Sequence, residues 1–545
     1  MTTKINMISR MIPVFLTSFF LMGCQTGEAA EQLIQKEWET TSKERVSIHD
    51  PSITTIHEEN QELFYVFGSH LAQAKTSDLR TWEVPFSHEY ESMEDNIIYG
   101  NTKENLAETF KWAGYDDADS KGGYSLWAPD VIWNADYEWS NGDKGAYMLY
   151  YSASSTWRRS AIGLAVAKTI EGPYSYSDTV IYSGFTEKDS TDGSDRNTNY
   201  QNTHLAKLIK DGKISGFSEN WSIEAGLTYN TDYAPNAIDP ALFYDEEGKL
   251  WMTYGSWSGG IFLLEVDPAT GKPMYPGEDS TTEDSTTEDG RIIDRYFGIK
   301  LSGGYHQSGE GPYIVYDEKT DYYYLFVTYG GLAAKGGYNM RLFRAEKPEG
   351  PYLDAQGNSP ILDKGEQNVN YGIKLIGNYQ FSFQQMGYRA AGHNSAIIDE
   401  NGQWSLVYHT RFNNGTEAHE VRVNRMYMNE EGWPVPAPYE YRGNEQVADA
   451  LTEDEIIGRY EIINHGTDNG TTMLKTQMIE FQKDGNVTGD LTGTWTYDAG
   501  YLVLTFEETT FKGILLTQEI TEFEQQKLTF STIGDNNESI WGIKE

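Results

Sequence analysis

The sequence HDPSITTIHEENQELFYVFGS, residues 49–69, carries the pattern that decides the fold. A polar residue beside Pro opens it, a short apolar stretch follows, and a turn leads into an aromatic stretch, as in a β-hairpin. The chain repeats this order at residues 128 (APDVIWNADYEWSNGDKGAYMLYYSAS), 238 (IDPALFYDEEGKLWMTYGSWSGG), 309 (GEGPYIVYDEKTDYYYLFVTYGG) and 392 (GHNSAIIDENGQWSLVYHTRF). Most of these units are followed by a third strand, so each predicts a small antiparallel sheet.

Small sheets that repeat and are arranged radially form a β-propeller. The sequence therefore predicts an all-β protein with a five-bladed β-propeller over residues 46–447. A β-sandwich with many hairpins is the alternative, but sandwiches do not usually repeat one polar opening five times. Residues 449–545 change to short alternating strands and predict a smaller C-terminal β-barrel or sandwich domain. Two insertions, residues 186–234 and 278–290, receive no predicted function.

The composition of the chain argues against several classes of function. The chain has 545 residues, with 42 Lys and Arg against 82 Asp and Glu, which gives a net charge of −40. A phosphate backbone repels such a surface, which argues against nucleic-acid binding. The single cysteine, Cys24, excludes a disulfide framework and a cysteine-zinc site. A bound metal would use oxygen or imidazole ligands, which favours a hard cation such as calcium.

The N-terminus predicts a targeting segment. An apolar run from Met11 to Met22 follows two positive charges and is too short to span a bilayer comfortably. This layout is typical of a secretory signal peptide over residues 1–23. Leu21-Met22-Gly23-Cys24 resembles the bacterial lipobox, which implies cleavage before Cys24 and lipidation of its thiol. An ordinary signal peptide is the alternative, and residues 24–45 predict a polar tether.

The polar residues that open the five units are the candidate site. They are Asp50, Asp130, Asp239, Glu310 and His393. The first strand of each propeller blade lines the central channel, so we expect these residues to occupy one slot of the repeat and to converge. Paired carboxylates in a cleft suit glycoside hydrolysis, in which one protonates the leaving oxygen and another activates water. We expect Asp130 to be a structural, strand-opening residue.

Taken together, the motifs of residues 46–412 resemble glycoside hydrolase family 43, the five-bladed propellers that act on arabinan and xylan. The motifs that carry this resemblance are His49-Asp50-Pro51-Ser52, Trp127-Ala128-Pro129-Asp130, Asn236-Ala237-Ile238-Asp239-Pro240-Ala241, Ser308-Gly309-Glu310-Gly311-Pro312 and Gly392-His393-Asn394-Ser395. The third motif, the later segment YGSWSGG from Tyr254 and the segment SSTWRRSAIG from Ser154 are particularly similar to endo-α-1,5-L-arabinanases. The C-terminal β-domain resembles the extra domain of the longer members.

The resemblance implies an inverting mechanism with three acidic residues. Asp50 is then the general base, Glu310 the general acid, and Asp239 the residue that orients the acid and tunes its acidity. His393 matches a histidine that holds one calcium ion whose other ligands are mostly water. The implied substrate contacts are Asp50, Asn236, Ala237, Ile238, Asp239, Ser256, Trp257 and Ser258.

The predicted function is endo-acting hydrolysis of plant cell-wall α-1,5-L-arabinan by an extracellular, lipid-anchored monomer. We expect its contact with the bacterial membrane to be through the N-terminal lipid only. An exo-acting arabinofuranosidase or β-xylosidase on the same fold is one alternative. A non-catalytic carbohydrate-binding propeller is another, although Asp50, Asp239 and Glu310 are all present. An interaction propeller of the WD-repeat type lacks its Gly-His and Trp-Asp signature here.

Overall fold

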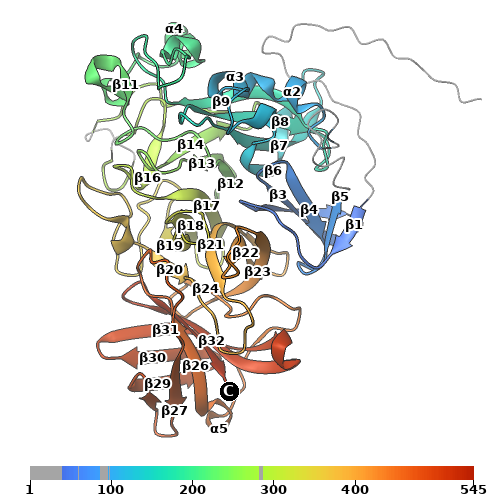
Figure 1. Cartoon of the computed structure of the whole chain (residues 1–545), viewed down its shortest axis with the longest axis vertical. Helices are drawn as coiled ribbons and strands as arrows, with labels where there is room; N and C mark the ends of the chain where they lie inside the picture. The colour runs from blue at the N-terminus through green and yellow to red at the C-terminus, as the bar shows by residue number, and fades with distance from the viewer. Residues whose placement is uncertain (1–39, 59–60, 86–95, 97, 282–286, 292) are drawn as a thin grey trace, which may run out of the picture.

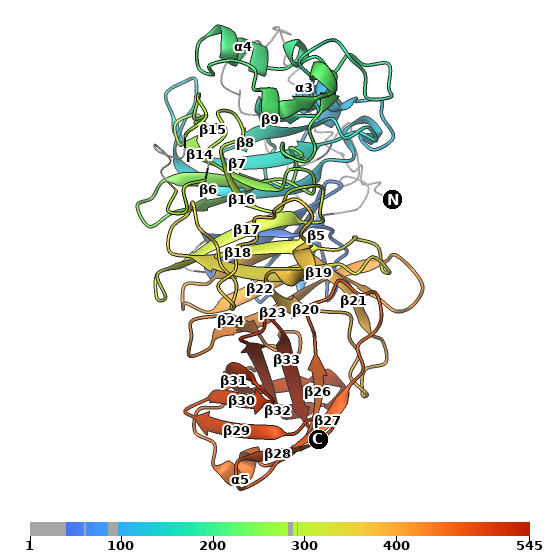
Figure 2. The same cartoon turned by 90° about the vertical axis from the view of Figure 1, so that its left-hand side faces the viewer.

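A computed structural model of the chain describes residues 40–545 except 59–60, 86–95, 97, 282–286 and 292. The predicted signal peptide, Cys24 and most of the predicted tether lie outside these residues. The chain forms a propeller followed by a C-terminal barrel. The barrel lies at one end of the long axis of the molecule (Figures 1 and 2). No helix within the described ranges is both long and apolar enough to cross a bilayer.

Five antiparallel sheets confirm the predicted five-bladed propeller. Blade I contains β1 (Thr40–Lys43), β2 (Ser52–Glu58), β3 (Gln61–Gly68), β4 (Ala72–Thr76) and β5 (Trp82–Pro85). Blade II contains β6 (Trp127–Glu138), β7 (Lys144–Ala153), β8 (Ser160–Ala167) and β9 (Ser175–Ser183). Blade III contains β12 (Ala241–Tyr244), β13 (Leu250–Tyr254), β14 (Ile261–Asp267), β15 (Lys272–Pro273) and β16 (Ile299–Ser302). Blade IV contains β17 (Glu310–Asp317), β18 (Tyr322–Tyr329), β19 (Asn339–Ala345) and β20 (Ile373–Ile376). Blade V contains β21 (Tyr388–Ile398), β22 (Trp404–Phe412), β23 (His419–Met428) and β24 (Pro434–Pro436).

The first and last blades join through packed side chains and through the N–H of Val421, which donates to the carbonyl of Val46 at 2.9 Å. Strand β1 pairs with β5 of its own blade, so blade V receives no strand from the described part of the N-terminus. Instead, Val407 and Val421 of blade V pack with Ile48 and Val66 of blade I in one buried apolar cluster. Strand β1 also corrects the predicted tether, because the polar edge strand Thr40–Lys43 already belongs to blade I.

The C-terminal domain is a closed barrel rather than a sandwich. Its strands are β26 (Gly458–Asn464), β27 (Gln477–Phe481), β28 (Asn486–Gly489), β29 (Gly493–Asp498), β30 (Tyr501–Phe506), β31 (Thr509–Ile520), β32 (Gln525–Gly534) and β33 (Ser539–Lys544). Pairing of β31 with β32 closes the cylinder, which leaves few free strand edges. The short β25 (Gln446–Val447) adds to β31, and α5 (Glu453–Ile456) precedes β26.

Two buried cations of blade IV hold the barrel against the propeller. Arg341 is fully buried and donates to the carbonyl of Thr467 and to the side-chain oxygen of Asn469, at 3.0 Å for the latter. Lys374 is 3% exposed and donates to the carbonyl of Asp468 at 2.7 Å. The barrel loop between β26 and β27 therefore satisfies charges that would otherwise be buried without partners.

Short helices and the first insertion lie at the opposite end of the molecule (Figure 1). Helices α2 (Thr102–Asn105) and α3 (Ala107–Ala113) connect blades I and II. The insertion of residues 186–234 contains α4 (Leu205–Lys210) and the hairpin of β10 (Ser222–Ile223) and β11 (Thr228–Tyr229). Its Trp221 is fully buried in the core between blades II and III, so this insertion is a folded part of the propeller.

Candidate active site

Five residues with a left-handed backbone line one small cavity at the propeller axis, one from each blade. They are Asp50 (φ 55°), Ala128 (φ 36°), Asp239 (φ 57°), Gly311 (φ 58°) and His393 (φ 45°), and we call them the axial ring. Proline follows each of the first four and Asn394 follows the fifth. Left-handed residues other than glycine are strained, and such strain clusters at functional sites.

The axial ring corrects the expected register of the candidate residues. Asp50, Asp239 and His393 share one slot, as predicted, but Asp130 lies two residues after the ring and Glu310 one residue before it. The hairpin pattern could not reveal this offset because it marks strands without fixing which residue turns at the axis.

Hydrogen bonds connect the axial ring from blade to blade. The N–H groups of Ala128, Asp239 and His393 donate to the hydroxyls of Ser69, Ser152 and Thr328 of the preceding blade, at 2.8, 2.9 and 2.8 Å. The N–H of Asp50 donates to Nδ1 of His409 in blade V at 3.2 Å, which completes the connection to blade I. Gly311 differs, because its N–H donates to the carboxyl of Asp239 at 3.2 Å.

The carboxylate of Asp50 is buried and surrounded by donors. Its Oδ1 lies 2.7 Å from Nδ1 of His49 and 3.1 Å from Nδ1 of His393, and its Oδ2 accepts from the hydroxyl of Ser69 at 2.5 Å. Burial alone raises the pKa of Asp50, but the imidazoles of His393 and His49 lower it by more, so its pKa lies well below the usual value. Asp50 is therefore ionised over the range in which a general base must act.

Glu310 is held by three side chains. Its Oε2 accepts from Nε1 of Trp257 at 2.9 Å and from the hydroxyl of Ser256 at 3.2 Å. Its Oε1 accepts from the hydroxyl of Tyr338 at 2.6 Å. Trp257 has a left-handed backbone (φ 49°), and this turn directs its indole to the carboxylate. Glu310 is half-buried, so its carboxyl can still meet a ligand.

Asp239 holds its proton more strongly than an exposed carboxyl group does. Burial raises its pKa first, and the carboxylates of Glu310 and Asp50 raise it further, to well above the usual value. Ionising two neighbouring carboxyl groups costs free energy because their charges repel. The environment therefore gives the carboxyl groups of this site different pKa values. Asp50 and Asp239 occupy the same slot but have opposite protonation preferences.

Asp130 has the structural contacts expected of it. It accepts hydrogen bonds from the hydroxyl of Ser52 in blade I and from the N–H of Leu242 in blade III, the latter at 2.7 Å. Asp130 is 3% exposed, and burial raises its pKa to about 6. It therefore joins three blades beside the axis.

The residues around His393 fit the predicted calcium ion. A Cβ on Gly311 would lie 2.8 Å from the imidazole, so glycine is required for the histidine to stand there. Because Nδ1 faces Asp50, Nε2 is the nitrogen left for a metal. Asn394 lines the same cavity, and within the described structure neither polar atom of its buried amide has a partner. One imidazole, one free amide and nearby carboxyls suit a hydrated hard cation.

A groove beside Glu310 collects four of the eight predicted substrate contacts, and Asp50 and Asp239 line the axial cavity instead. It is lined by Asp119, Trp127, Ser154, Ser155, Thr156, Arg158, Asn236, Ser256, Trp257 and Ser258. Ala237 and Ile238 are buried and do not line it. At the groove, Nη1 of Arg158 lies 2.9 Å from Nε2 of His306, which joins the loops before β8 and β17. The groove brings together residues from separate blades, as a polymer site requires.

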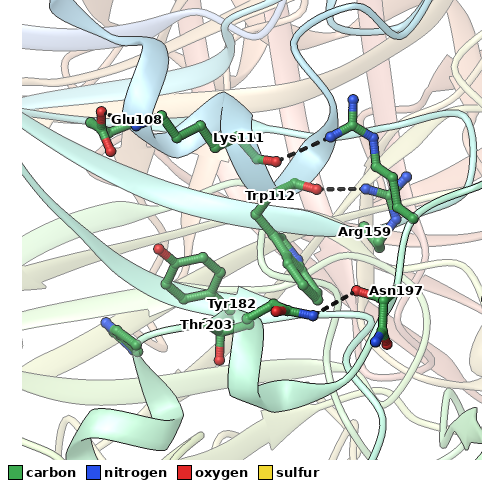
Figure 3. A pocket seen from close by; sticks show the side chains of 10 residues that line it. Glu108, Lys111, Trp112, Arg159, Tyr182, Asn197 and Thr203 are labelled. Carbon is green, nitrogen blue, oxygen red and sulfur yellow. Dashed lines mark hydrogen bonds and ion pairs between the residues drawn. The ribbon is translucent and has the colours of Figure 1, made fainter. Parts of the chain in front are cut away.

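A second pocket lies away from the carboxylates. Figure 3 shows it between α3 and the first insertion, lined by residues that include Trp112, Arg159, Tyr182 and Asn197. None of the predicted site residues lines it. Arg159 is already engaged there with the carbonyl of Trp112 at 2.5 Å and with Asp192.

Sequence reasoning missed several residues that contact the carboxyl groups. Ser69, His49 and Tyr338 all donate to Asp50 or Glu310. One signal was available, because a small polar residue ends the second strand of successive units, as in Gly68-Ser69 and Gly255-Ser256. Tyr338 follows Gly336-Gly337 and had no such repeat signal.

Comparison with known proteins gives the family. The family model of glycosyl hydrolases family 43 matches residues 197–434. A second family model, that of a C-terminal lipocalin-like domain, matches residues 438–542. An extracellular endo-alpha-(1->5)-L-arabinanase 2 from Bacillus subtilis is 38% identical over 514 residues, 92% of this chain and 93% of that protein. The relative from Thermotoga petrophila is 37% identical over 511 residues, 91% of this chain and 93% of that protein. The crystal structure of endo-1,5-alpha-L-arabinanase from Thermotoga petrophila has a TM-score of 0.73 at 35% identity and covers 94% of this chain and 99% of that one. With this similarity along both domains, the chain belongs to glycosyl hydrolase family 43.

Proposed function

We propose that this protein hydrolyses α-1,5-linked L-arabinan at internal bonds. The observation that carries the proposal is the pairing of an ionised, buried Asp50 with a half-buried Glu310 beside an open groove. Two relatives of similar length are named endo-arabinanases, which supports arabinan as the substrate. The groove takes residues from blades II and III and from the segment before blade II, which suits a chain more than a single sugar.

In the proposed mechanism Glu310 is the general acid. Its proton passes to the glycosidic oxygen as the bond to the anomeric carbon breaks. The carboxylate that forms is then stabilised by Trp257, Ser256 and Tyr338, donors already in place before the reaction. Asp239 lies close enough to Glu310 for the two carboxyl groups to influence each other's pKa, and its own raised pKa favours the uncharged form.

Asp50 is the general base. A carboxylate offers about four acceptor positions. Three donors, His49, His393 and Ser69, already contact Asp50. The remaining position can accept from a water molecule, which attacks the anomeric carbon from the face opposite the leaving oxygen and gives its proton to Asp50. This step inverts the configuration.

His393 and Asn394 would hold the calcium ion in the axial cavity. The ion would supply positive charge and strengthen the interaction between Nδ1 of His393 and the Asp50 carboxylate, which lie 3.1 Å apart. Outside the described residues, Cys24 would carry the lipid that anchors an extracellular, monomeric enzyme to the bacterial membrane. The two relatives are named extracellular, which supports secretion.

Product analysis on linear arabinan, debranched arabinan and xylan tests the proposal. We expect a fast loss of viscosity with little reducing sugar on debranched arabinan and no activity on xylan. Arabinose as the sole early product would indicate an exo-acting enzyme, and xylose release would indicate a xylosidase. An absence of hydrolysis with retained binding would indicate a carbohydrate-binding propeller.

A further inference from the structure

His49 connects the carboxylate of Asp50 to a buried arginine. Its Nδ1 lies 2.7 Å from Oδ1 of Asp50. On the other side of the ring, its Nε2 lies 3.2 Å from a terminal guanidinium nitrogen of Arg411. Arg411 extends from β22 and is only 6% exposed, and Glu417 binds its Nε at 3.0 Å. The three side chains Arg411, His49 and Asp50 thus form one continuous line.

This line permits only one form of the imidazole. A guanidinium group has donors and no acceptor, so Nε2 of His49 must accept. A histidine nitrogen that accepts carries no proton, and the proton then lies on the other nitrogen. Nδ1 of His49 is therefore the donor to Asp50. Arg411 selects this tautomer and excludes the one that would place a lone pair against the carboxylate.

The surroundings keep the ring of His49 in its plane. It stacks on His409 with the ring centroids 4.0 Å apart and an interplanar angle of 28°. His419 meets it edge-on at 5.1 Å. His409 is fully buried and accepts from the N–H of Asp50, so the stack also fixes the backbone of the base. His49 is consequently constrained by a stacked ring on one face, by an edge contact with a second ring and at both nitrogens.

We propose that His49 is a positioning residue for the general base and that Arg411 acts through it. The bond from His49 fixes the rotation of the Asp50 carboxyl group, so that its free acceptor position faces the attacking water. The inference rests on the assignment of Asp50 as the base. The hairpin pattern alone would not have given His49 this role.

Two substitutions of His49 separate positioning from packing. In H49N the amide nitrogen takes the place of Nδ1, whereas in H49Q it takes the place of Nε2. We expect H49N to keep kcat on debranched arabinan within about 5-fold, and H49Q to lose about 10- to 100-fold in kcat, as for a lost hydrogen bond to a charged group, with KM nearly unchanged. Both substitutions should lower the Tm measured by thermal unfolding by a similar amount. H57Q, at an exposed histidine on β2, is the matched control and should leave kcat unchanged.

A double-mutant cycle tests the role of Arg411. R411M removes the donors but keeps the length of the side chain. It should lower kcat about 10-fold in the wild type and have little further effect in H49N, because an amide has no tautomer to select. Equal kcat losses in H49N and H49Q, or equal effects of R411M in both backgrounds, would overturn the inference. A wild-type protein without activity on arabinan would instead refute the proposed function.

Discussion

Replacing Asp130 by Asn separates a structural carboxyl group from the catalytic ones. The amide keeps both contacts, since its nitrogen can donate to Ser52 and its oxygen can accept from the N–H of Leu242. It removes only the negative charge. If Asp130 has no part in the reaction, kcat and KM on arabinan should stay within about 3-fold of the wild-type values.

The effect on stability follows from the pKa of Asp130. Burial raises this pKa from 3.8 to about 6, a difference of about 2 units, or about 3 kcal/mol at about 1.4 kcal/mol per unit. The folded state keeps its proton to a higher pH than the unfolded state does. The free energy of unfolding therefore falls as the pH rises from about 4 to about 6, and remains lower above that range. Asn does not ionise, so D130N should lack this fall.

The assay is urea unfolding of wild type and D130N at about pH 4 and about pH 7.5, in the presence of a chelator. We expect similar stability at the lower pH and a gain of up to about 3 kcal/mol for D130N at the higher pH. Calcium should shrink this gain, because a cation in the axial cavity favours ionised Asp130. D130A is the control, and it should cost about 1–3 kcal/mol relative to D130N because the buried N–H of Leu242 loses its acceptor. A D130N variant that is less stable than wild type at the higher pH, or whose kcat falls more than about 10-fold at unchanged KM, would refute this reasoning.

Four further predictions concern the proposed function. Glu310→Gln should lose about 10²–10⁴-fold on arabinan and much less on an aryl glycoside with a good leaving group, and equal losses on both would contradict an acid role. Asp50→Asn should abolish hydrolysis while arabinan still binds in affinity electrophoresis, and any product rescued by azide should be inverted; a retained product would make Asp50 a nucleophile. A chelator should lower activity or Tm and calcium should restore it, with His393→Ala insensitive to both; active enzyme free of metal by elemental analysis would count against the ion. Cys24→Ser should release active protein from the membrane fraction, and a variant still bound to membranes would contradict lipidation.

The repeated hairpin was enough to predict the propeller. The aromatic second strands, such as Tyr322–Tyr329, are buried along nearly their whole length, as a continuous apolar stretch allows. The C-terminal strands were also recognisable, but barrel and sandwich remained open. The pairing of β31 with β32 closes the sheet into a barrel. The alternation of apolar and polar residues does not show which strands pair, so this closure could not be predicted from it.

The candidate site was predictable in its residues but not in its connections. In β17 the residue with the left-handed backbone is Gly311, within the bulge between Glu310 and Tyr313, so Glu310 lies one position before the ring. The prolines that follow four of the ring positions are visible in the sequence, and aligning the units on them could have set the register. By contrast, the contacts of His49 with Arg411 and of Tyr338 with Glu310 depend on how blades pack, which one sequence does not specify.

The bond between the N–H of Asp50 and His409 has a consequence for biosynthesis. These residues are 359 positions apart, so the general base reaches its final position only after nearly the whole propeller has left the ribosome. A nascent or truncated chain that ends before blade V would contain both proposed catalytic carboxyl groups and still lack the partners that hold one of them. Catalytic competence in this molecule therefore reports that the chain is complete to its last blade.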